Sequence, residues 1–159
     1  MKERLNYLKQ SPRLGQKLVE FGQALLGESL QADLVDLVNI RASQINGCAF
    51  CLDMHVKEAK IHGERELRLH HVAIWRESPL FSSKERAALE WTEAVTIIAG
   101  NDVPDELYQR VRKEFSEKEL ADLTFAIGTI NFWNRLNVSF KIVPGSADEM
   151  LGLAKAGLS

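Results

Sequence analysis

The sequence predicts an all-α protein with a single domain. Every apolar segment of useful length repeats its hydrophobic residues at helical spacing, and none alternates convincingly with the period of two that is typical of strands. With 159 residues, the chain is long enough for one domain that buries about 70% of its unfolded surface. We found no repeat, low-complexity tract or linker. We therefore expect one helical domain over residues 1–159, with a core from about residue 10 to residue 145.

Cap and turn residues separate four expected helices in the N-terminal half. Ser11 and Pro12 have the pattern of an N-cap followed by proline at the first helical position, and Gly27 follows the last apolar residue of this segment. Asn46 and Gly47 should end the second helix, because both residues tolerate left-handed backbone conformations. The expected helices span residues 12–26, 30–45, 48–60 and 64–76.

Two capping boxes begin helices in the C-terminal half. In this motif a serine and a glutamate three residues later satisfy backbone N–H groups at a helix N-terminus. Ser82 with Glu85 begins one helix, which Gly100 should end, and Ser116 with Glu119 begins a longer one. The expected helices of this half span residues 83–99, 104–115 and 117–143.

The end of the chain has a weaker pattern. Pro144 and Gly145 should end the ordered core, because neither residue continues a helix well. Residues 146–159 are small and weakly amphipathic, so they form either a docked C-terminal helix or a loose tail. The whole pattern corresponds to a fold of about six to eight helices.

The composition is that of an ordinary globular protein. Hydrophobic residues make up 45% and charged residues 26%, and a formal net charge of −2 gives no basic surface for nucleic acid. The first ten residues lack the apolar core of a signal peptide, and no later run approaches the roughly 20 apolar residues of a membrane span. We expect a cytoplasmic protein that binds neither nucleic acid nor membrane.

Both cysteines of the chain lie in one short stretch, NGCAFCLDMH. A domain of this size needs no disulfide or metal for stability, and in a reducing compartment a close pair is more typical of catalysis, redox sensing or metal binding. On the first turns of a helix, Cys48 and Cys51 are three residues apart and His55 follows four residues later, so all three share one face. Cα atoms at the cysteine spacing lie about 5 Å apart, which a disulfide tolerates.

A thiol pair beside a histidine can reduce a peroxide. One thiolate attacks the O–O bond and becomes a sulfenic acid, the second thiol condenses with it to a disulfide, and a separate reductant resets the pair. The helix N-terminus and the imidazole favour the thiolate of Cys51, but a lower pKa gains only about threefold in rate, because nucleophilicity falls with the pKa. Protonation of the departing oxygen is worth about a hundredfold, so proton transfer is the expected role of His55.

Other uses of the cysteine pair fit the sequence less well. A structural zinc site needs four protein ligands, and only a distant histidine or carboxylate could complete Cys48, Cys51 and His55. Attachment of a c-type haem needs histidine directly after the second cysteine, where Leu52 stands. A thioredoxin domain needs strands around the motif. We therefore expect no metal and no cofactor, and zinc is kept as an alternative.

The residues around the cysteines resemble a known family. LVDLVNIRASQINGCAFCLDMHVKEA, residues 34–59, resembles the core motif of the AhpD-like alkylhydroperoxidases within the carboxymuconolactone decarboxylase superfamily. WRESPLFSSKERAALEWTEAV and INFWNR are similar to later segments of that family. The resemblance covers about residues 10–145 and implies a helical AhpD-like fold in trimers or hexamers. It also implies that Cys51 attacks the peroxide, that Cys48 is the resolving thiol, and that His55 relays protons.

Two positions depart from the family pattern. The family motif has a relay glutamate twelve residues before the first cysteine, and here this position holds the shorter Asp36. The resemblance implies that Asp36 fills this role through a shifted backbone or an extra water, and a solvated helix carboxylate is the alternative. Some members of the family have a histidine between the cysteines, where this chain has Phe50.

We expect a thiol-dependent peroxidase or disulfide reductase that acts on small organic hydroperoxides. A dithiol or a thioredoxin-like protein should serve as its reductant, and the chain should form a homo-oligomer. Besides zinc binding, two alternatives stay open. One is a redox-sensing or binding protein that oxidises once without turnover. The other is a decarboxylase-like member of the superfamily, although those enzymes generally work without this cysteine pair.

Overall fold

The computed structural model describes residues 2–100 and 102–158, so the first and last residues of the expected domain lie outside it. Over this part of the chain the all-α prediction is confirmed, because every regular element is a helix. None of these helices is long and apolar enough to cross a membrane. The α-helices are α1 (Tyr7–Gln10), α2 (Pro12–Leu25), α3 (Ala32–Ile45), α4 (Ala49–Ile61), α5 (Glu66–His71), α6 (Ser83–Thr96), α7 (Asp105–Val111), α8 (Glu117–Phe140) and α9 (Asp148–Leu151), and the 3-10 helices are η1 (Val72–Glu77) and η2 (Leu153–Ala156).

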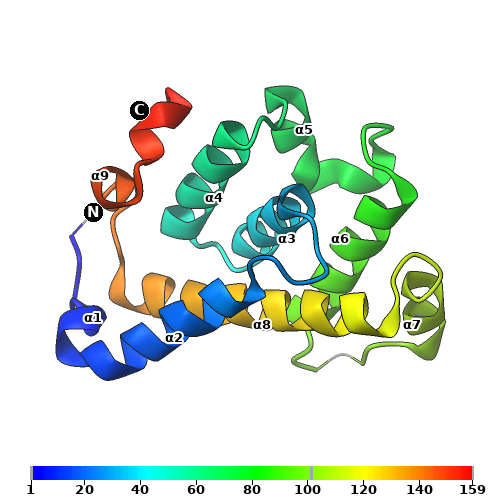
Figure 1. Ribbon diagram of the computed structural model, residues 1–159, viewed down its shortest axis with the longest axis horizontal. Coiled ribbons are helices and arrows are strands. Elements are labelled where there is room, and N and C mark those ends of the chain that lie inside the picture. Colours follow the sequence, from blue (N-terminus) through cyan, green and yellow to red (C-terminus); the bar gives the residue numbers. More distant parts are fainter. Residues whose placement is uncertain (1, 101, 159) are drawn as a thin grey trace.

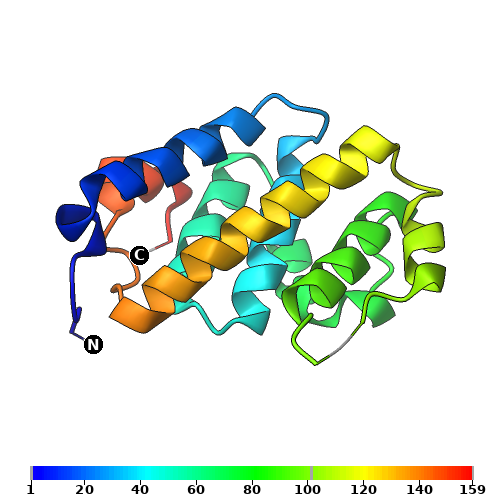
Figure 2. The same cartoon turned by 90° about the horizontal axis from the view of Figure 1, so that it is seen from below.

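Helix α3 lies at the centre of the molecule and packs against α4, α6 and α8 (Figure 1). The long helix α8 crosses the molecule from end to end, and α2 packs against its outer side (Figure 2). The chain termini and α9 lie at the same end of the molecule, on the left of Figure 1. The N-terminus of α4 points towards this end as well.

Two faces of α3 build the core. Leu34 and Val38 lie in one apolar cluster with residues of α6, α7 and α8. Leu37 and Ile40 lie in a second cluster with residues of α4, α5, η1 and α6. Because each residue of an α-helix advances by about 100°, these two pairs lie on adjacent faces of the same helix. The position of the α3–α4 turn, where the cysteines lie, is therefore fixed by packing against both clusters.

The predicted capping boxes both form. The Ser82 side chain accepts from the backbone N–H of Glu85, whose carboxylate accepts from the Ser82 N–H, and α6 begins there. Ser116 and Glu119 make the same exchange at the start of α8.

The end of α6 was predicted wrongly. The helix ends at Thr96 rather than at Gly100, and Ile98, inside the expected range, is exposed. Residues 95–98 are all β-branched, and such side chains lose χ1 freedom in a helix, so this run favours an early end. The Thr96 hydroxyl also accepts from the amide of Asn131 on α8, at 3.0 Å.

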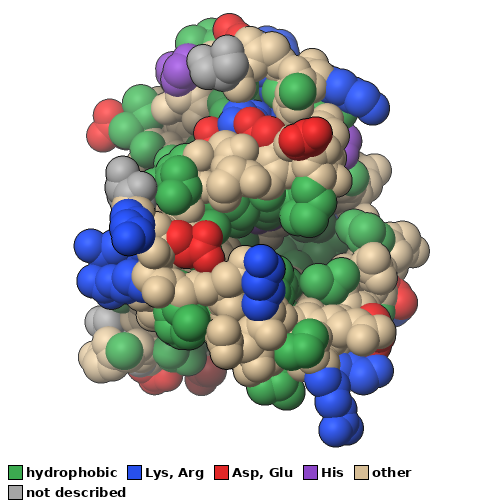
Figure 3. All heavy atoms as spheres, turned by 90° about the vertical axis from the view of Figure 1, so that its left-hand side faces the viewer, with side chains coloured by type: hydrophobic (Ala, Val, Ile, Leu, Met, Phe, Trp, Pro, Cys, Tyr) green, Lys and Arg blue, Asp and Glu red, His purple; other side chains and the backbone are tan. Residues whose placement is uncertain are grey.

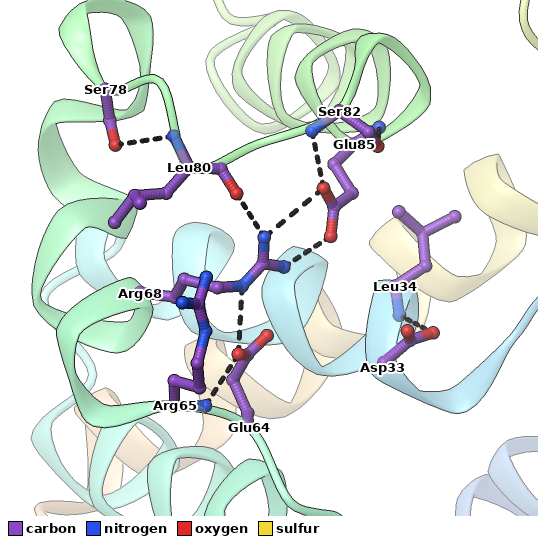
Figure 4. Close-up of polar contacts among 9 residues, drawn as sticks. All are labelled: Asp33, Leu34, Glu64, Arg65, Arg68, Ser78, Leu80, Ser82 and Glu85. Carbon is purple, nitrogen blue, oxygen red and sulfur yellow. Dashed lines mark hydrogen bonds and ion pairs between the residues drawn. The ribbon is translucent and has the colours of Figure 1, made fainter.

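Arg68 holds α5 to the start of α6 (Figure 4). Its guanidinium donates to the Glu64 carboxylate at 2.9 Å, to the Glu85 carboxylate and to the carbonyl of Leu80. Burial acts to raise the pKa of Glu85, but the hydrogen bonds from Arg68 and Ser82 outweigh it, and the pKa is lowered. One carboxylate thus both caps α6 and anchors the preceding segment.

The C-terminal segment is docked rather than loose. The ammonium of Lys57, a buried residue of α4, lies 2.8 Å from the Asp53 carboxylate and 2.7 Å from the Asp148 carboxylate of α9. Leu153 and Ala156 of η2 are buried, and η2 packs against α4. The helix that carries the cysteines is therefore covered by the end of the chain.

The N-terminal segment packs against the C-terminal end of α8. Helix α1, which the sequence did not predict, is a single turn capped by the Asn6 side chain, an acceptor from the Lys9 N–H at 3.0 Å. The Arg4 N–H donates to the carbonyl of Phe140 at 2.9 Å. The rings of Tyr7 and Phe140 lie 5.6 Å apart. These contacts bring Tyr7 close to α8.

Candidate active site

The turn between α3 and α4 places both cysteines at the N-terminus of α4. Asn46 ends α3, and Gly47 has a φ of 63°, a conformation that glycine adopts without steric cost. The Cys48 N–H donates to the carbonyl of Ser43 at 3.0 Å, which closes the turn. Cys48 then becomes the N-cap of α4, and Cys51 lies in its first turn.

Buried asparagines of α8 hold this turn in place. The Asn46 amide donates to Asn131 Oδ1 at 2.9 Å and to Asn134 Oδ1 at 2.8 Å. The Asn134 amide donates to Ser43 Oγ at 3.1 Å, and Asn137 follows one turn later. From the sequence, INFWNR was interpreted only as a family segment, and this function of its asparagines was not predicted. The available signal was the three-residue spacing of Asn131, Asn134 and Asn137, which places their amides on one face of the helix.

Cys48 and Cys51 form a disulfide. Their Cα atoms lie 5.4 Å apart, close to the distance expected from the spacing. Both residues are buried, with exposed fractions of 2% and 0%. Cys48 Sγ accepts from the backbone N–H of Cys51 at 3.3 Å, and Cys51 Sγ accepts from Asn137 Nδ2 at 3.3 Å. Each sulfur therefore has one N–H donor.

Apolar side chains surround the disulfide. Ala42 and Ile130 complete the buried cluster around the sulfurs. Phe50 and Trp133 pack against the cluster and are partly exposed, so they connect it with the surface. The side of the molecule on which the chain termini lie is hollowed, and hydrophobic side chains line the hollow (Figure 3).

His55 lies one turn after Cys51 on α4 and is only 7% exposed. Its Nδ1 is 2.6 Å from Glu58 Oε2. Because a carboxylate oxygen accepts, Nδ1 carries the hydrogen of this bond. The other ring nitrogen, Nε2, is buried and has no hydrogen-bond partner among the described residues. An unpaired buried polar atom costs about 1–3 kcal/mol, so Nε2 marks a place where a polar group can bind or react.

Asp36 is buried beside a second histidine. Its Oδ2 lies 2.6 Å from Nδ1 of His62, the half-exposed C-cap of α4. Burial raises the pKa of Asp36, although the hydrogen bond from His62 opposes this effect. The same hydrogen bond raises the pKa of His62. The charges of Glu58 and His55 also shift the pKa of Asp36, so the two histidine–carboxylate pairs interact.

The structure thus brings Cys48, Cys51 and His55 together on α4. Within the described residues, the Asp36 carboxylate bonds to His62, and Glu58 bonds to His55. Glu58 was not predicted as a site residue, although its position three residues after His55 on a helix was a signal. No group of three His, Cys, Asp or Glu side chains in residues 2–100 and 102–158 could hold a metal ion.

The sequence profile of the carboxymuconolactone decarboxylase family matches residues 12–94, more than half of the chain. The chain belongs to this family. Its membership explains the AhpD-like motif around the cysteines, and the predicted resemblance is confirmed.

Two family relatives are similar along much of this chain. The uncharacterised protein YdfG of Bacillus subtilis is 38% identical over 139 residues, which cover 87% of this chain and 95% of YdfG. The uncharacterised protein YnjA of Escherichia coli is 39% identical over 107 residues, which cover 67% of this chain and 58% of YnjA.

Solved structures support the fold of this family member. A protein of unknown function from Agrobacterium tumefaciens, named as a candidate AhpD antioxidant defence protein, has a TM-score of 0.87 and 41% identity and covers 90% of this chain and 98% of its own. The debrominase Bmp8 has a TM-score of 0.76 at 16% identity, covering 94% of this chain and 80% of its own, which shows the fold alone. The predicted AhpD-like fold is confirmed, and the family and the cysteine pair are consistent with an enzyme of antioxidant function.

Proposed function

We propose that this protein is a thiol-dependent peroxidase that reduces small organic hydroperoxides. The proposal rests on the disulfide at the N-terminus of α4, together with the buried, unpartnered Nε2 of His55 one turn further along. A disulfide that joins residues three apart closes a very short loop and removes little entropy from the unfolded chain. Redox chemistry is therefore a better explanation of the pair than stability.

The reaction begins with the thiolate of Cys51. It attacks one oxygen of the hydroperoxide ROOH, so that an S–O bond forms, the O–O bond breaks, and the sulfur is oxidised to a sulfenic acid. The departing alkoxide takes a proton and leaves as the alcohol ROH. The Cys48 thiolate then attacks the Cys51 sulfur, the S–O bond breaks, and hydroxide leaves as water after protonation. Two electrons pass from the thiols to the peroxide.

His55 supplies the proton to the departing alkoxide. In the imidazolium, Nδ1–H donates to Glu58 and Nε2–H is free to protonate an oxygen beside Cys51. Positioned proton donors of this kind typically contribute about 10²–10⁴-fold in rate. Glu58 acts through the histidine, because its carboxylate orients the ring and stabilises its positive charge.

Asp36 and His62 extend this relay towards solvent. His62 is half exposed and can exchange protons with water, and its Nδ1 is bonded to Asp36. The charges of His55 and Glu58 act on Asp36, which supports a relay in which a water molecule carries protons between the two pairs. In this proposal Asp36 returns protons to His55 after each turnover.

The substrate and the reductant follow from the surroundings of the sulfurs. Because the sulfurs are buried among apolar side chains, we propose a small, partly apolar hydroperoxide that enters beside Phe50 and Trp133. The chain has only two cysteines, so the electrons that reset the disulfide come from another molecule, a dithiol or a thioredoxin-like protein. We place the cycle in the cytoplasm, where such reductants are maintained.

The outer face of α2 and α8 is the proposed contact between copies of the chain in a trimer or hexamer. Helix α2 is strongly amphipathic, yet it has no buried residue. Extended exposed apolar surfaces mark protein interfaces. Large apolar side chains exposed on these two helices are Leu14, Val19, Phe21, Phe125, Phe132 and Val138.

Turnover with an added reductant tests the proposed function. Prereduced protein with cumene hydroperoxide and dihydrolipoamide should consume many equivalents of peroxide, and Cys51→Ser should abolish this turnover. Cys48→Ser should stop at a sulfenic acid on Cys51. Oxidation without regeneration by any dithiol would favour a redox sensor, and unchanged turnover in Cys51→Ser would overturn the assignment.

A further inference from the structure

A side chain from α8 contacts the sulfur of Cys51. Asn137 Nδ2 donates to Cys51 Sγ at 3.3 Å, across 86 residues of sequence. Asn137 is only 4% exposed, so water does not compete strongly for its amide. A disulfide sulfur can accept a hydrogen bond but has no hydrogen to donate. The amide therefore directs its NH₂ group at the sulfur and its oxygen away from it.

Tyr7 fixes that orientation from the other side. Its O–H donates to Asn137 Oδ1 at 2.7 Å, and its ring packs on Phe140. Burial, together with the charge of Glu3, raises the pKa of Tyr7 to about 12. The phenol therefore keeps its hydrogen at every pH at which a peroxidase works. A continuous hydrogen-bonded chain runs from α1 through Asn137 to Cys51.

The two sulfurs accept hydrogen bonds from different kinds of donor. Cys48 Sγ accepts from a backbone N–H at the start of α4, which no substitution of a side chain removes. Cys51 Sγ accepts from Asn137, so its environment depends on a single amide. A hydrogen bond to the charged form of a group favours that form. The amide of Asn137 thus acts on the sulfur that we assign to attack on peroxide.

We propose that Asn137 is a catalytic residue that stabilises the Cys51 thiolate, and that Tyr7 is the positioning residue that aims its amide. The N-terminal segment, although far from the cysteines in sequence, is then part of the active site. This inference rests on the proposed function for its biological meaning. The state of the Cys51 sulfur can nevertheless be measured without any peroxide.

The test measures the pKa of Cys51 from the pH dependence of its alkylation by iodoacetamide. In prereduced protein that carries Cys48→Ser, Asn137→Leu should raise this pKa by about one unit, the size expected when a charged group loses one hydrogen bond. Asn137→Asp should raise it further, because a carboxylate then faces the thiolate. Tyr7→Phe should raise it by less than Asn137→Leu does.

Two controls separate this role from a structural one. Leu123→Ala removes a buried side chain of α8 that lies in the apolar cluster with Leu34 and Val38 rather than around the sulfurs, and it should lower the melting temperature without changing the pKa of Cys51. In a Cys51→Ser background, Asn137→Leu should leave the pKa of Cys48 unchanged. An unchanged pKa of Cys51 in folded Asn137→Leu overturns the inference. If Asn137→Leu does not fold, an unchanged pKa of Cys51 in Tyr7→Phe overturns it instead. A shift without peroxide turnover would overturn only the proposed function.

Discussion

Each histidine of the site is paired with one carboxylate. Glu58 bonds to Nδ1 of His55, and Asp36 bonds to Nδ1 of His62. A carboxylate on one ring nitrogen fixes the tautomer and leaves the other nitrogen for proton exchange. For His55 this other nitrogen is buried and unpartnered, which makes Glu58 the residue whose removal should be most informative.

Replacement of Glu58 by glutamine should slow the peroxidase reaction by about tenfold or more, because the proton donor loses its stabilising charge while the amide oxygen can still accept from Nδ1. The rate of peroxide consumption under saturating reductant measures this effect. Glu90→Gln, which breaks an exposed ion pair with Arg110, serves as the charge-matched control and should leave the rate unchanged. Equal rates for Glu58→Gln and wild type would remove Glu58 from the relay.

Replacement of Asp36 by asparagine should lower the pKa of His62, because the hydrogen bond from this histidine to the carboxylate is what raises it. An NMR titration of the His62 ring measures the shift. The same variant should slow turnover severalfold if Asp36 returns protons to His55. A normal turnover rate together with a lowered pKa of His62 would show that the Asp36–His62 pair has a structural role and does not carry protons to His55.

Local spacing predicted the part of the site that lies on one helix. Cys48, Cys51 and His55 are neighbours on α4 because helical geometry places residues three and four apart on one face. The contact of Asn137 with Cys51 could not be predicted in this way, because it depends on how α8 packs against α4. Asp36 was found only from its place in the family motif, and its hydrogen bond with His62, 26 residues later, depends on how α3 packs against α4.

The ends of helices show where local chemistry decides structure and where it does not. Glu119 in the capping box of α8 accepts from Lys84 Nζ at 2.6 Å and from the Ser116 N–H at 2.8 Å. These hydrogen bonds lower its pKa from 4.5 to about 2. Since the carboxylate is favoured in the folded state, its charge stabilises α8 at neutral pH.

Replacement of Glu119 by glutamine should therefore lower stability by about 1 kcal/mol at pH 7, the typical size of a helix N-terminal charge effect. The folded-state pKa is depressed, so this contribution is complete above the unfolded pKa near 4.5 and is lost as the pH falls towards 2. Urea unfolding at several pH values measures it. A difference that is independent of pH would show that the charge contributes nothing.

Capping boxes were predictable because serine and glutamate act on backbone groups within one turn. The end of α6 was not, because Gly100 offered a familiar stop signal while the β-branched residues 95–98 ended the helix earlier. Helix α1 was missed for a different reason. Its single turn is held by tertiary contacts of Arg4 and Tyr7 with the end of α8, which no local pattern reveals.

At the scale of the whole molecule, apolar periodicity predicted helices but could not tell a core face from an interface. Leu14 lies on the apolar face of α2, and it is 71% exposed in the single chain. The same pattern in α3 is buried on two sides. The difference depends on the order in which helices pack, and the family resemblance, rather than periodicity, led us to expect an oligomer.

Substitution of Leu14 or Phe132 by glutamate should break the proposed oligomer into smaller species, because a charge at an apolar contact between copies is costly to bury. Both side chains are exposed in the single chain, so its fold should be little affected. Light scattering after size-exclusion chromatography measures the mass. Met150→Glu on α9, where the side chain is 78% exposed, is the matched control and should leave assembly unchanged.

The most direct measurement of peroxidase chemistry is a count of free thiols in prereduced protein before and after one equivalent of an organic hydroperoxide. We predict a fall from two thiols to none within seconds, and recovery to two after dihydrolipoamide is added. Two thiols that persist in the presence of the hydroperoxide would contradict the proposal that Cys51 attacks peroxides and that Cys48 resolves the product.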